Sequence, residues 1–176
     1  MALTPDELDR IAARTLAHYD EQALSYWNGT RDHDVSQNVD ALLRHIEAPS
    51  PYELLDFGCG PGRDLRTFKA LGHHATGLEG AANLAALART NSGCTVLEQN
   101  FLALDLPHGR YDGVFANAVL FHVPSRQENF FAYMMQHFDI DGLIEYGVQS
   151  LPGTVASIYK ALGITAAAGG TRKLIS

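Results

Sequence analysis

The sequence has few of the features that place a protein in an oxidising compartment, a membrane or a nucleic-acid complex. Its only two cysteines, Cys59 and Cys94, exclude a disulfide framework and favour a reducing compartment such as the cytoplasm. No apolar run approaches the ~20 residues that a membrane-spanning helix needs. There are 13 Lys and Arg against 20 Asp and Glu, a net charge of −7. Without a basic run, such a chain is unsuited to nucleic acid or to an anionic membrane surface.

What the sequence does have is the composition of one globular domain. Of its 176 residues, 46% are hydrophobic and 19% charged, enough to bury a core. Thr4 and Glu7 have the spacing of a capping box, which predicts a helix over 5–26 that ends at Asn28-Gly29. Asp34 is expected to cap a second helix, whose apolar face reaches residue 46.

From residue 52 onward, short apolar runs alternate with amphipathic stretches. Such alternation is typical of an α/β fold with a mostly parallel sheet. Strands are predicted at 52–57, 75–78, 95–100 and 111–116, and helices at 63–71 and 81–89. Further along, a helix is expected at 126–138, a strand at 143–148 and a short helix at 155–162.

The strongest motif is the glycine loop Asp56-Phe57-Gly58-Cys59-Gly60-Pro61-Gly62, where the first strand gives way to a helix. Ligands bind beyond the carboxyl ends of strands in such sheets, and glycines let them approach the backbone. Dinucleotide-binding loops have the spacing G-x-G-x-x-G. Here the third glycine comes one residue early and Arg63 stands in its place, which disfavours a nicotinamide oxidoreductase.

Two carboxylates restrict the kind of ligand that this loop could bind. Asp56 would repel a pyrophosphate but suits a cation. Glu79, which ends the second strand, is placed to accept hydrogen bonds from both hydroxyls of a ribose. Together they describe an adenosine ligand with a positively charged tail, which fits S-adenosylmethionine. The alternative is a glycine-rich turn without a ligand.

These features resemble the class I, Rossmann-like S-adenosylmethionine-dependent methyltransferases over about residues 52–122. The resemblance implies that Asn100 and Phe101 frame the adenine, and that Asn117 and Val119 face the cofactor while His122 faces the substrate. Core packing is the alternative for Phe101 and Val119. The expected cofactor-binding residues are Asp56, Gly58, Cys59, Gly60, Gly62, Glu79, Gly80, Asn100, Phe101, Asn117 and Val119. Cys59 is expected to act there as a small filler.

The segment 27–38 is too polar for a core and contains His33 flanked by Asp32 and Asp34. On residue type alone it is either a lid over the cofactor site or a solvated loop. Residues 26–38, 55–65 and 115–125 together resemble the C-terminal methyltransferase domain of ovothiol biosynthesis enzymes (5-histidylcysteine sulfoxide synthases). That resemblance implies methylation of a ring nitrogen of 5-thiohistidine to give ovothiol A and S-adenosylhomocysteine, in a domain normally fused to an iron-dependent sulfoxide synthase.

The resemblance also suggests roles for individual side chains. Arg31 is expected to hold the carboxylate of a zwitterionic acceptor, and Asp32 or Asp34 its ammonium group. His33 or His122 is expected to bind the ring or take its proton, because histidine titrates near neutral pH. The expected substrate-binding residues are Tyr26, Arg31, Asp32, His33, Asp34 and Asn38, the expected catalytic residues are His33, His122 and Asp32, and no metal site is expected.

The predicted organisation is a helical lid and substrate segment at 1–50, a cofactor-binding core at 51–125 and a divergent segment at 126–176, all in one domain. Beyond residue 125 the resemblance fades, so the C-terminal strands of the fold are expected to be incomplete. Three functions therefore compete: a methyltransferase of 5-thiohistidine, a methyltransferase of another small molecule, and a non-catalytic S-adenosylmethionine-binding module.

Overall fold

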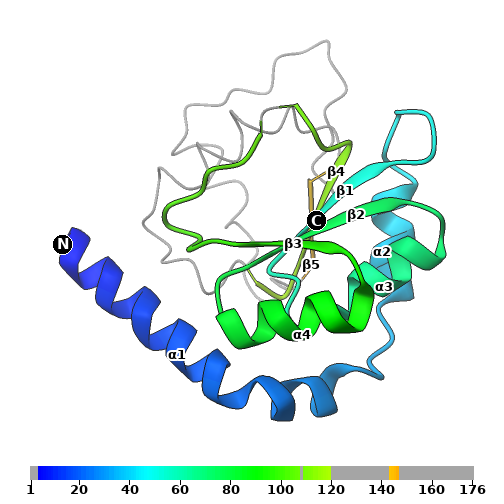
Figure 1. The fold of residues 1–176 in the computed structure, drawn as a ribbon. Helices are drawn as coiled ribbons and strands as arrows, with labels where there is room; N and C mark the ends of the chain where they lie inside the picture. Colours follow the sequence, from blue (N-terminus) through cyan, green and yellow to red (C-terminus); the bar gives the residue numbers. More distant parts are fainter. Residues whose placement is uncertain (1–3, 108, 120–142, 147–176) are drawn as a thin grey trace.

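The computed structural model describes residues 4–107, 109–119 and 143–146 (Figure 1). Five strands form one sheet in the order β3-β2-β1-β4-β5, and every neighbouring pair is parallel. The strands are β1 (Glu53–Phe57), β2 (His74–Glu79), β3 (Thr95–Glu98), β4 (Gly113–Asn117) and β5 (Leu143–Tyr146). The predicted parallel α/β sheet is thus confirmed. The helices expected at 126–138 and 155–162 lie outside the described residues, as does His122.

Two helices cross over between the first three strands, and two more precede the sheet. They are α1 (Pro5–Thr30), α2 (Ser36–Leu43), α3 (Arg63–Ala70) and α4 (Ala82–Ser92). The predicted capping box is present, because the Thr4 side chain accepts the Glu7 N–H and the Glu7 carboxylate accepts the Thr4 N–H at 2.8 Å. None of the described helices is both long and apolar enough to cross a membrane.

The predicted end of the first helix at Asn28-Gly29 is wrong. The helix continues to Thr30, and the N–H of Arg31 still donates to the Trp27 carbonyl at 3.0 Å. The Thr30 hydroxyl also donates to the carbonyl of Tyr26 at 2.8 Å. Gly29 keeps a helical backbone, and the carbonyl of Thr30 beyond it accepts a hydrogen bond from Arg63, a distant contact that a local glycine signal cannot foresee.

The start of α2 also differs from the prediction. Val35 is the N-cap and makes no side-chain capping bond, while the Asp34 carboxylate accepts the Ser36 N–H at 2.9 Å. Asp34 therefore fixes the turn that leads into the helix instead of capping it. The helix ends at Leu43, although Ile46 still packs in the core beyond it.

The core lies on both faces of the sheet because successive strand residues point to opposite sides. Leu54 and Phe115 pack against Val39 and Leu42 of α2 and Phe68 of α3. The opposite face buries a second cluster, made of Leu55, Phe57, Leu78, Leu106, Val114, Ala116 and Val119. The strands are apolar on both faces, as expected for a parallel sheet covered on each side.

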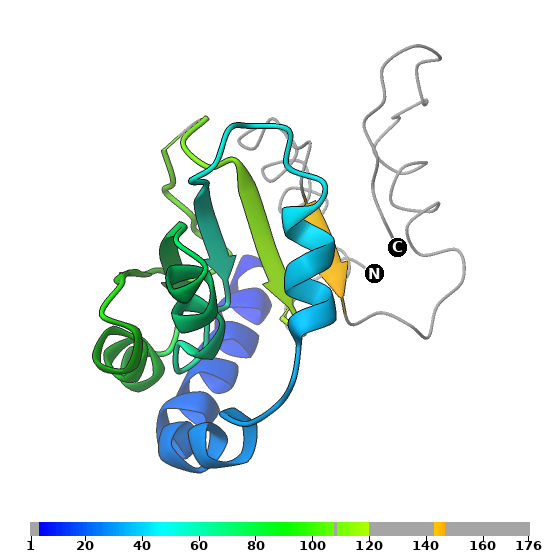
Figure 2. The ribbon, with the colours of Figure 1, turned by 90° about the vertical axis from the view of Figure 1, so that its right-hand side faces the viewer.

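The strand order reverses between β1 and β4. From β1 the chain moves outward through β2 to β3, and it then returns to place β4 on the other side of β1. In such sheets ligands bind outside the carboxyl ends of the strands at this switch point. Figure 2 shows α1, in blue, lying at the end of the sheet toward which the strand arrows point.

Candidate functional site

A cavity lies between α1 and the carboxyl edge of the sheet, at the switch point. Its sheet side is formed by residues at or beyond the carboxyl ends of β1, β2, β3 and β4 and by one residue of α4, namely Gly58, Gly60, Glu79, Leu84, Asn100, Phe101, Leu102, Asn117, Ala118 and Val119. Its other side is formed by α1, through Ile11, Ala12, Thr15, Leu16, Tyr19 and Tyr26. Seven of the predicted cofactor-binding residues thus meet around one cavity, because the parallel strands bring their carboxyl ends together.

The glycine loop turns sharply away from β1 to enter this cavity. Gly58, Gly60 and Gly62 have φ angles of 71°, 52° and 87°, a region that residues with a Cβ rarely adopt. The N–H groups of Gly58 and Cys59 both donate to the Leu78 carbonyl, at 2.8 and 3.0 Å, which holds the loop against the end of β2. The loop conformation is therefore built from backbone contacts between two neighbouring strands.

The third glycine of the loop serves packing between helices. A Cβ on Gly62 would lie 2.9 Å from both the Cα and the carbonyl oxygen of Ala88 in α4. Gly62 is also the residue from which α3 starts. This explains the unusual spacing of the motif, because the third glycine contacts α4 instead of the cavity, and the position after it is left to Arg63.

Glu79 is the polar centre of the loop region. Its Oε2 atom accepts the Gly60 N–H at 2.9 Å, and its Oε1 atom accepts the N–H groups of Gly80 and Ala81 at 2.8 and 3.0 Å. Burial raises the pKa of this carboxyl, while the three backbone hydrogen bonds lower it. Glu79 therefore joins the glycine loop to the turn after β2, and the residue also lines the cavity.

A second carboxyl, Asp56, lies beneath the loop in β1 and does not line the cavity. It is 2% exposed, and its Oδ2 atom has no hydrogen-bond partner among the described residues. Burial raises the pKa of Asp56 well above its ordinary value, and the nearby Asp64 raises it further. Arg63 opposes this effect and forms an ion pair with Asp64 at 2.7 Å. Because Asp64 already pairs with the Arg63 guanidinium, no free cation remains beside Asp56 for a phosphate among these residues.

The far end of the cavity is framed by Asn100, Phe101, Asn117 and Val119. Phe101 packs on Phe57 with ring centres 4.7 Å apart, so the ring belongs to the core as well as to the cavity wall. Val119 is likewise part of the buried core cluster. The Asn100 Oδ1 atom accepts the Leu102 N–H at 3.0 Å, which fixes the orientation of this side chain. Phe101 and Val119 thus belong both to the core and to the cavity wall, and their contact with a cofactor stays a prediction.

The remaining predicted cofactor residues support the cavity from outside. Cys59 is buried against Leu65, Ala85, Ala88 and Val96, as expected for a small filler, and burial raises the pKa of its thiol. Gly80 donates to Glu79, and a Cβ on it would lie 2.7 Å from the side chain of Leu16. Gly62 contacts α4, as described above.

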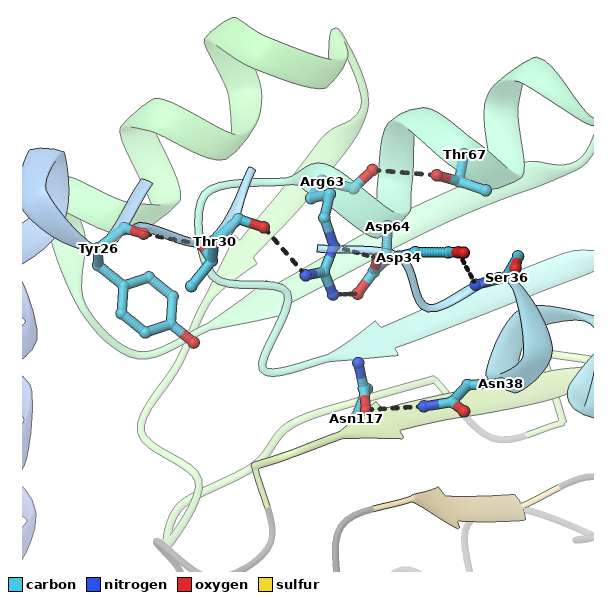
Figure 3. Close-up of polar contacts among 9 residues, drawn as sticks. All are labelled: Tyr26, Thr30, Asp34, Ser36, Asn38, Arg63, Asp64, Thr67 and Asn117. Atoms are coloured by element: carbon cyan, nitrogen blue, oxygen red, sulfur yellow. Dashed lines mark hydrogen bonds and ion pairs between the residues drawn. The ribbon is translucent and has the colours of Figure 1, made fainter. Parts of the chain in front are cut away.

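The polar segment between α1 and α2 is not part of the cavity wall. Arg31, Asp32, His33 and Asp34 are exposed, and none of them lines the cavity. Arg31 forms an ion pair with Asp32 at 3.4 Å. Of the predicted substrate residues, only two approach the site. Tyr26 lines the cavity, and the buried Asn38 donates from Nδ2 to the Oδ1 atom of Asn117 at 3.3 Å (Figure 3).

The α1 side of the cavity contains residues that the sequence analysis did not assign to the site. Ile11, Thr15 and Tyr19 recur every four residues, which predicts one helical face but not what that face covers. In the structure this face closes the cavity, and the Tyr19 and Tyr26 rings meet edge to face at 5.5 Å. The sequence shows that these residues share a helical face, but only the folded structure shows that this face lines the cavity.

Metal chemistry finds no support in the side chains that can be located. Among the described residues, no three His, Cys, Asp or Glu side chains gather in a way that could hold a metal ion. His33 is exposed, His45 is half-buried and follows α2, and His73 and His74 are adjacent at the start of β2. The chemistry of the cavity is therefore that of backbone amides, carboxyls, asparagine amides and tyrosines.

Solved structures that this chain resembles include methyltransferases. Magnesium protoporphyrin IX methyltransferase from Synechocystis, with bound S-adenosylmethionine, is 15% identical and superposes with a TM-score of 0.66 over 99% of this chain and 93% of that one. A TehB-like S-adenosylmethionine-dependent methyltransferase from Corynebacterium glutamicum is 19% identical, with a TM-score of 0.64 over 83% of each chain. These likenesses confirm the Rossmann-like class I methyltransferase fold.

A third structure shows the same fold within a much longer protein. Phosphoethanolamine N-methyltransferase 1 from Haemonchus contortus, in complex with phosphoethanolamine and S-adenosylhomocysteine, is 12% identical, with a TM-score of 0.58 over 76% of this chain and 30% of that one. No curated protein sequence matches this chain. Residues 54–142, half of the sequence, match the family described as "Methyltransferase domain". The chain therefore belongs to this methyltransferase family.

Proposed function

We propose that the protein transfers a methyl group from S-adenosylmethionine to a small molecule. The observation that carries this proposal is the convergence of the glycine loop, Glu79 and the Asn100–Phe101 pair on one cavity at the switch point of the sheet. The solved structures with this fold from Synechocystis and Haemonchus contain S-adenosylmethionine or S-adenosylhomocysteine.

The residues of the cavity fit such a cofactor. The glycine loop leaves backbone open to the ligand, and Glu79 lines the cavity where a ribose would need hydrogen-bond acceptors. Asn100 and Phe101 offer an amide and an apolar ring to an adenine. Asp64 is paired with Arg63, but the buried Asp56 has no hydrogen-bond partner for its Oδ2 atom among the described residues, and a positively charged ligand near it would favour its ionised form where a pyrophosphate would oppose it. When bound, the cofactor supplies an electrophilic methyl group on a sulfonium.

The contribution of the protein to methyl transfer is mainly positioning. A nucleophile must be held in line with the methyl group, about 3–3.5 Å away. Tyr26 and Asn117 are polar residues on opposite sides of the cavity wall. Asn117 can direct the acceptor through its amide, and Tyr26 can donate through its hydroxyl, which stays protonated because burial raises its pKa.

For the acceptor we propose a ring nitrogen of 5-thiohistidine, with ovothiol A as the methylated product. The support is the similarity of residues 26–38, 55–65 and 115–125 to the methyltransferase domain of ovothiol biosynthesis enzymes, together with the presence of Tyr26 and Asn38 at the site. His33 and Asp32 would act only if the exposed segment moved toward the cavity, and His122 lies outside the described residues. Their catalytic roles stay predictions, as do the roles of Arg31 and Asp34 in binding the zwitterion.

One observation favours a different acceptor. The α1 wall of the cavity presents Ile11, Ala12 and Leu16, and no charged side chain of the segment 31–34 lines it. An apolar or flat small molecule would fit such a wall better than a zwitterion would.

Binding and turnover together test the proposal. Calorimetry should show 1:1 binding of S-adenosylhomocysteine to the parent protein, weakened at least tenfold in Glu79→Ala and unchanged in Glu98→Ala, an exposed carboxylate on the neighbouring strand. Transfer of a labelled methyl group is then measured with histidine, 5-thiohistidine and an apolar imidazole. Absence of binding to the parent contradicts the cofactor assignment. Binding without any transfer indicates a non-catalytic module, and a preference for the apolar imidazole contradicts the 5-thiohistidine proposal.

A further inference from the structure

Arg63 occupies the position directly after the glycine loop, and its side chain reaches beyond its own helix. Its Nε and Nη2 atoms donate to the two carboxylate oxygens of Asp64, at 2.7 and 2.8 Å. Its Nη1 atom donates to the backbone carbonyl of Thr30 at 3.2 Å. Figure 3 shows the guanidinium lying between the end of α1 and the start of α3.

The carbonyl that Arg63 reaches belongs to the last turn of α1. Carbonyls at the end of a helix have no partner within the helix, and a cation is favoured there. No basic residue lies in the last turn of α1 itself. Arg31 follows at the C-cap but pairs with the exposed Asp32, so Arg63 adds a second positive charge to this helix end from another element.

The same turn of α1 carries Tyr26 over the glycine loop. The Thr30 hydroxyl donates to the Tyr26 carbonyl at 2.8 Å, so the two residues move as one turn. A Cβ placed on Gly60 would lie 3.5 Å from the Cε1 atom of the Tyr26 ring. The bond from Arg63 to Thr30 thus fixes how closely the ring approaches the loop.

The guanidinium is well suited to this task. Its side chain is 20% exposed, so solvent screens its hydrogen bonds only partly. The fork of Arg63 is held by both oxygens of Asp64, itself buried, which leaves Nη1 directed toward Thr30. A lysine could neutralise Asp64, but a single ammonium group would not reproduce this planar three-bond arrangement.

We propose that Arg63 is a positioning residue that ties the end of α1 to the glycine loop and thereby closes the cofactor cavity with Tyr26. The inference rests on the proposed function, since the closed cavity is the one assigned to the cofactor. It gives a role to the residue that stands where dinucleotide-binding loops have their third glycine, which in those loops allows close packing of the helix on the sheet.

The first test needs no ligand. Hydrogen exchange of the backbone amides of residues 28–31 is compared in the parent, Arg63→Lys, Arg63→Met and Arg66→Met. Arg66 lies on the same helix, is exposed and serves as the matched control. Loss of the hydrogen bond from the charged guanidinium should speed exchange about tenfold, relative to the parent, in both Arg63 variants. The Arg66→Met control should exchange at the rate of the parent. Arg63→Lys keeps a positive charge beside Asp64 but cannot also reach the Thr30 carbonyl in the same geometry. It therefore separates the effect of the Arg63–Thr30 hydrogen bond from that of the ion pair with Asp64. Equal exchange in all four proteins overturns the proposal.

The second test asks whether the Arg63–Thr30 hydrogen bond affects ligand binding in the cavity. Affinity for S-adenosylhomocysteine should fall roughly tenfold in Arg63→Met and in Tyr26→Leu. If Arg63 acts through Tyr26, the double variant should bind as weakly as either single variant, since residues in one network are not additive. Additive losses would show that Arg63 supports the fold only, and would overturn the role in closure. A parent protein that binds no S-adenosylhomocysteine contradicts the proposed function. The exchange experiment would still decide whether Arg63 holds the end of α1.

Discussion

Replacing Glu79 with glutamine should show how much of the glycine loop depends on one buried carboxylate. The Oε1 atom, which accepts two N–H groups, can be retained by the carbonyl oxygen of the amide. The Oε2 atom accepts the Gly60 N–H at 2.9 Å, and glutamine would place an NH2 group there, so two donors would face each other. The loop must then move, or the Gly60 N–H loses its partner.

The expected cost follows from that single lost bond. A buried donor left without a partner costs about 1–3 kcal/mol, so we expect Glu79→Gln to lower the free energy of unfolding by about 2 kcal/mol. In a domain of this size, 1 kcal/mol corresponds to roughly 2–4 °C in Tm, which gives a decrease of about 4–8 °C. Thermal and urea unfolding, followed by circular dichroism, measure both quantities.

The chain offers a matched control for this experiment. Glu98 lies opposite Glu79 in the register between β2 and β3, but it is exposed and pairs only loosely with Arg89, at 3.6 Å. Glu98→Gln makes the same chemical change and should alter the stability by less than about 0.5 kcal/mol. Equal losses in the two variants would refute the view that the Gly60 contact holds the loop.

The pH dependence provides a second check on Glu79. Because burial raises the pKa of this carboxyl in the folded protein, the unfolded chain ionises first as the pH rises. Its contribution to stability is therefore complete below the ordinary pKa of about 4.5 and is lost as the pH rises through the folded pKa. Glutamine does not titrate, so the stability difference between parent and Glu79→Gln should widen on acidification from neutral pH toward pH 4.5. A constant difference would contradict the raised pKa.

Three further predictions concern the surroundings of the site. Gly62→Ala should lower the free energy of unfolding by about 2 kcal/mol more than Gly72→Ala does. Both glycines have φ near +88°, but only a Cβ on Gly62 would lie against Ala88, at 2.9 Å. Urea unfolding of the two variants measures the difference. Burial and the neighbouring His74 lower the pKa of His73, and the neutral His73 ring accepts the Tyr52 N–H at its Nδ1 atom. The contribution of His73 to stability is therefore present above its ordinary pKa of about 6.5 and is lost as the pH falls through the folded pKa. His73→Gln should remove this part of the pH dependence, and an unchanged pH profile would contradict it. Thr4→Ala removes the capping box of α1 and should cost about 1 kcal/mol, without weakening the binding of S-adenosylhomocysteine.

Much of the fold could be predicted because its signals are local. The capping box, the alternation of apolar runs with amphipathic stretches, and the glycines after β1 each depend on neighbouring residues only. The end of α1 could not be predicted in this way. The sequence Asn28-Gly29 indicates a helix end, but Thr30 is held by Arg63, which lies far along the chain. Tertiary contact overrode a local preference worth about 1 kcal/mol.

The division is similar at the candidate site. The amino-acid sequence by itself determined which residue types stand at the strand ends, because the glycine run and the carboxyls of Asp56 and Glu79 are read directly from the local pattern. It also predicts a helical lid at 1–50, but only the tertiary structure decided which face of α1 lines the cavity, that Asp56 lies beneath the loop, and that the charged residues 31–34 face solvent. The physical reason is that the direction in which a helix presents its side chains follows from its packing partners, and those are set by contacts between residues that the sequence keeps far apart.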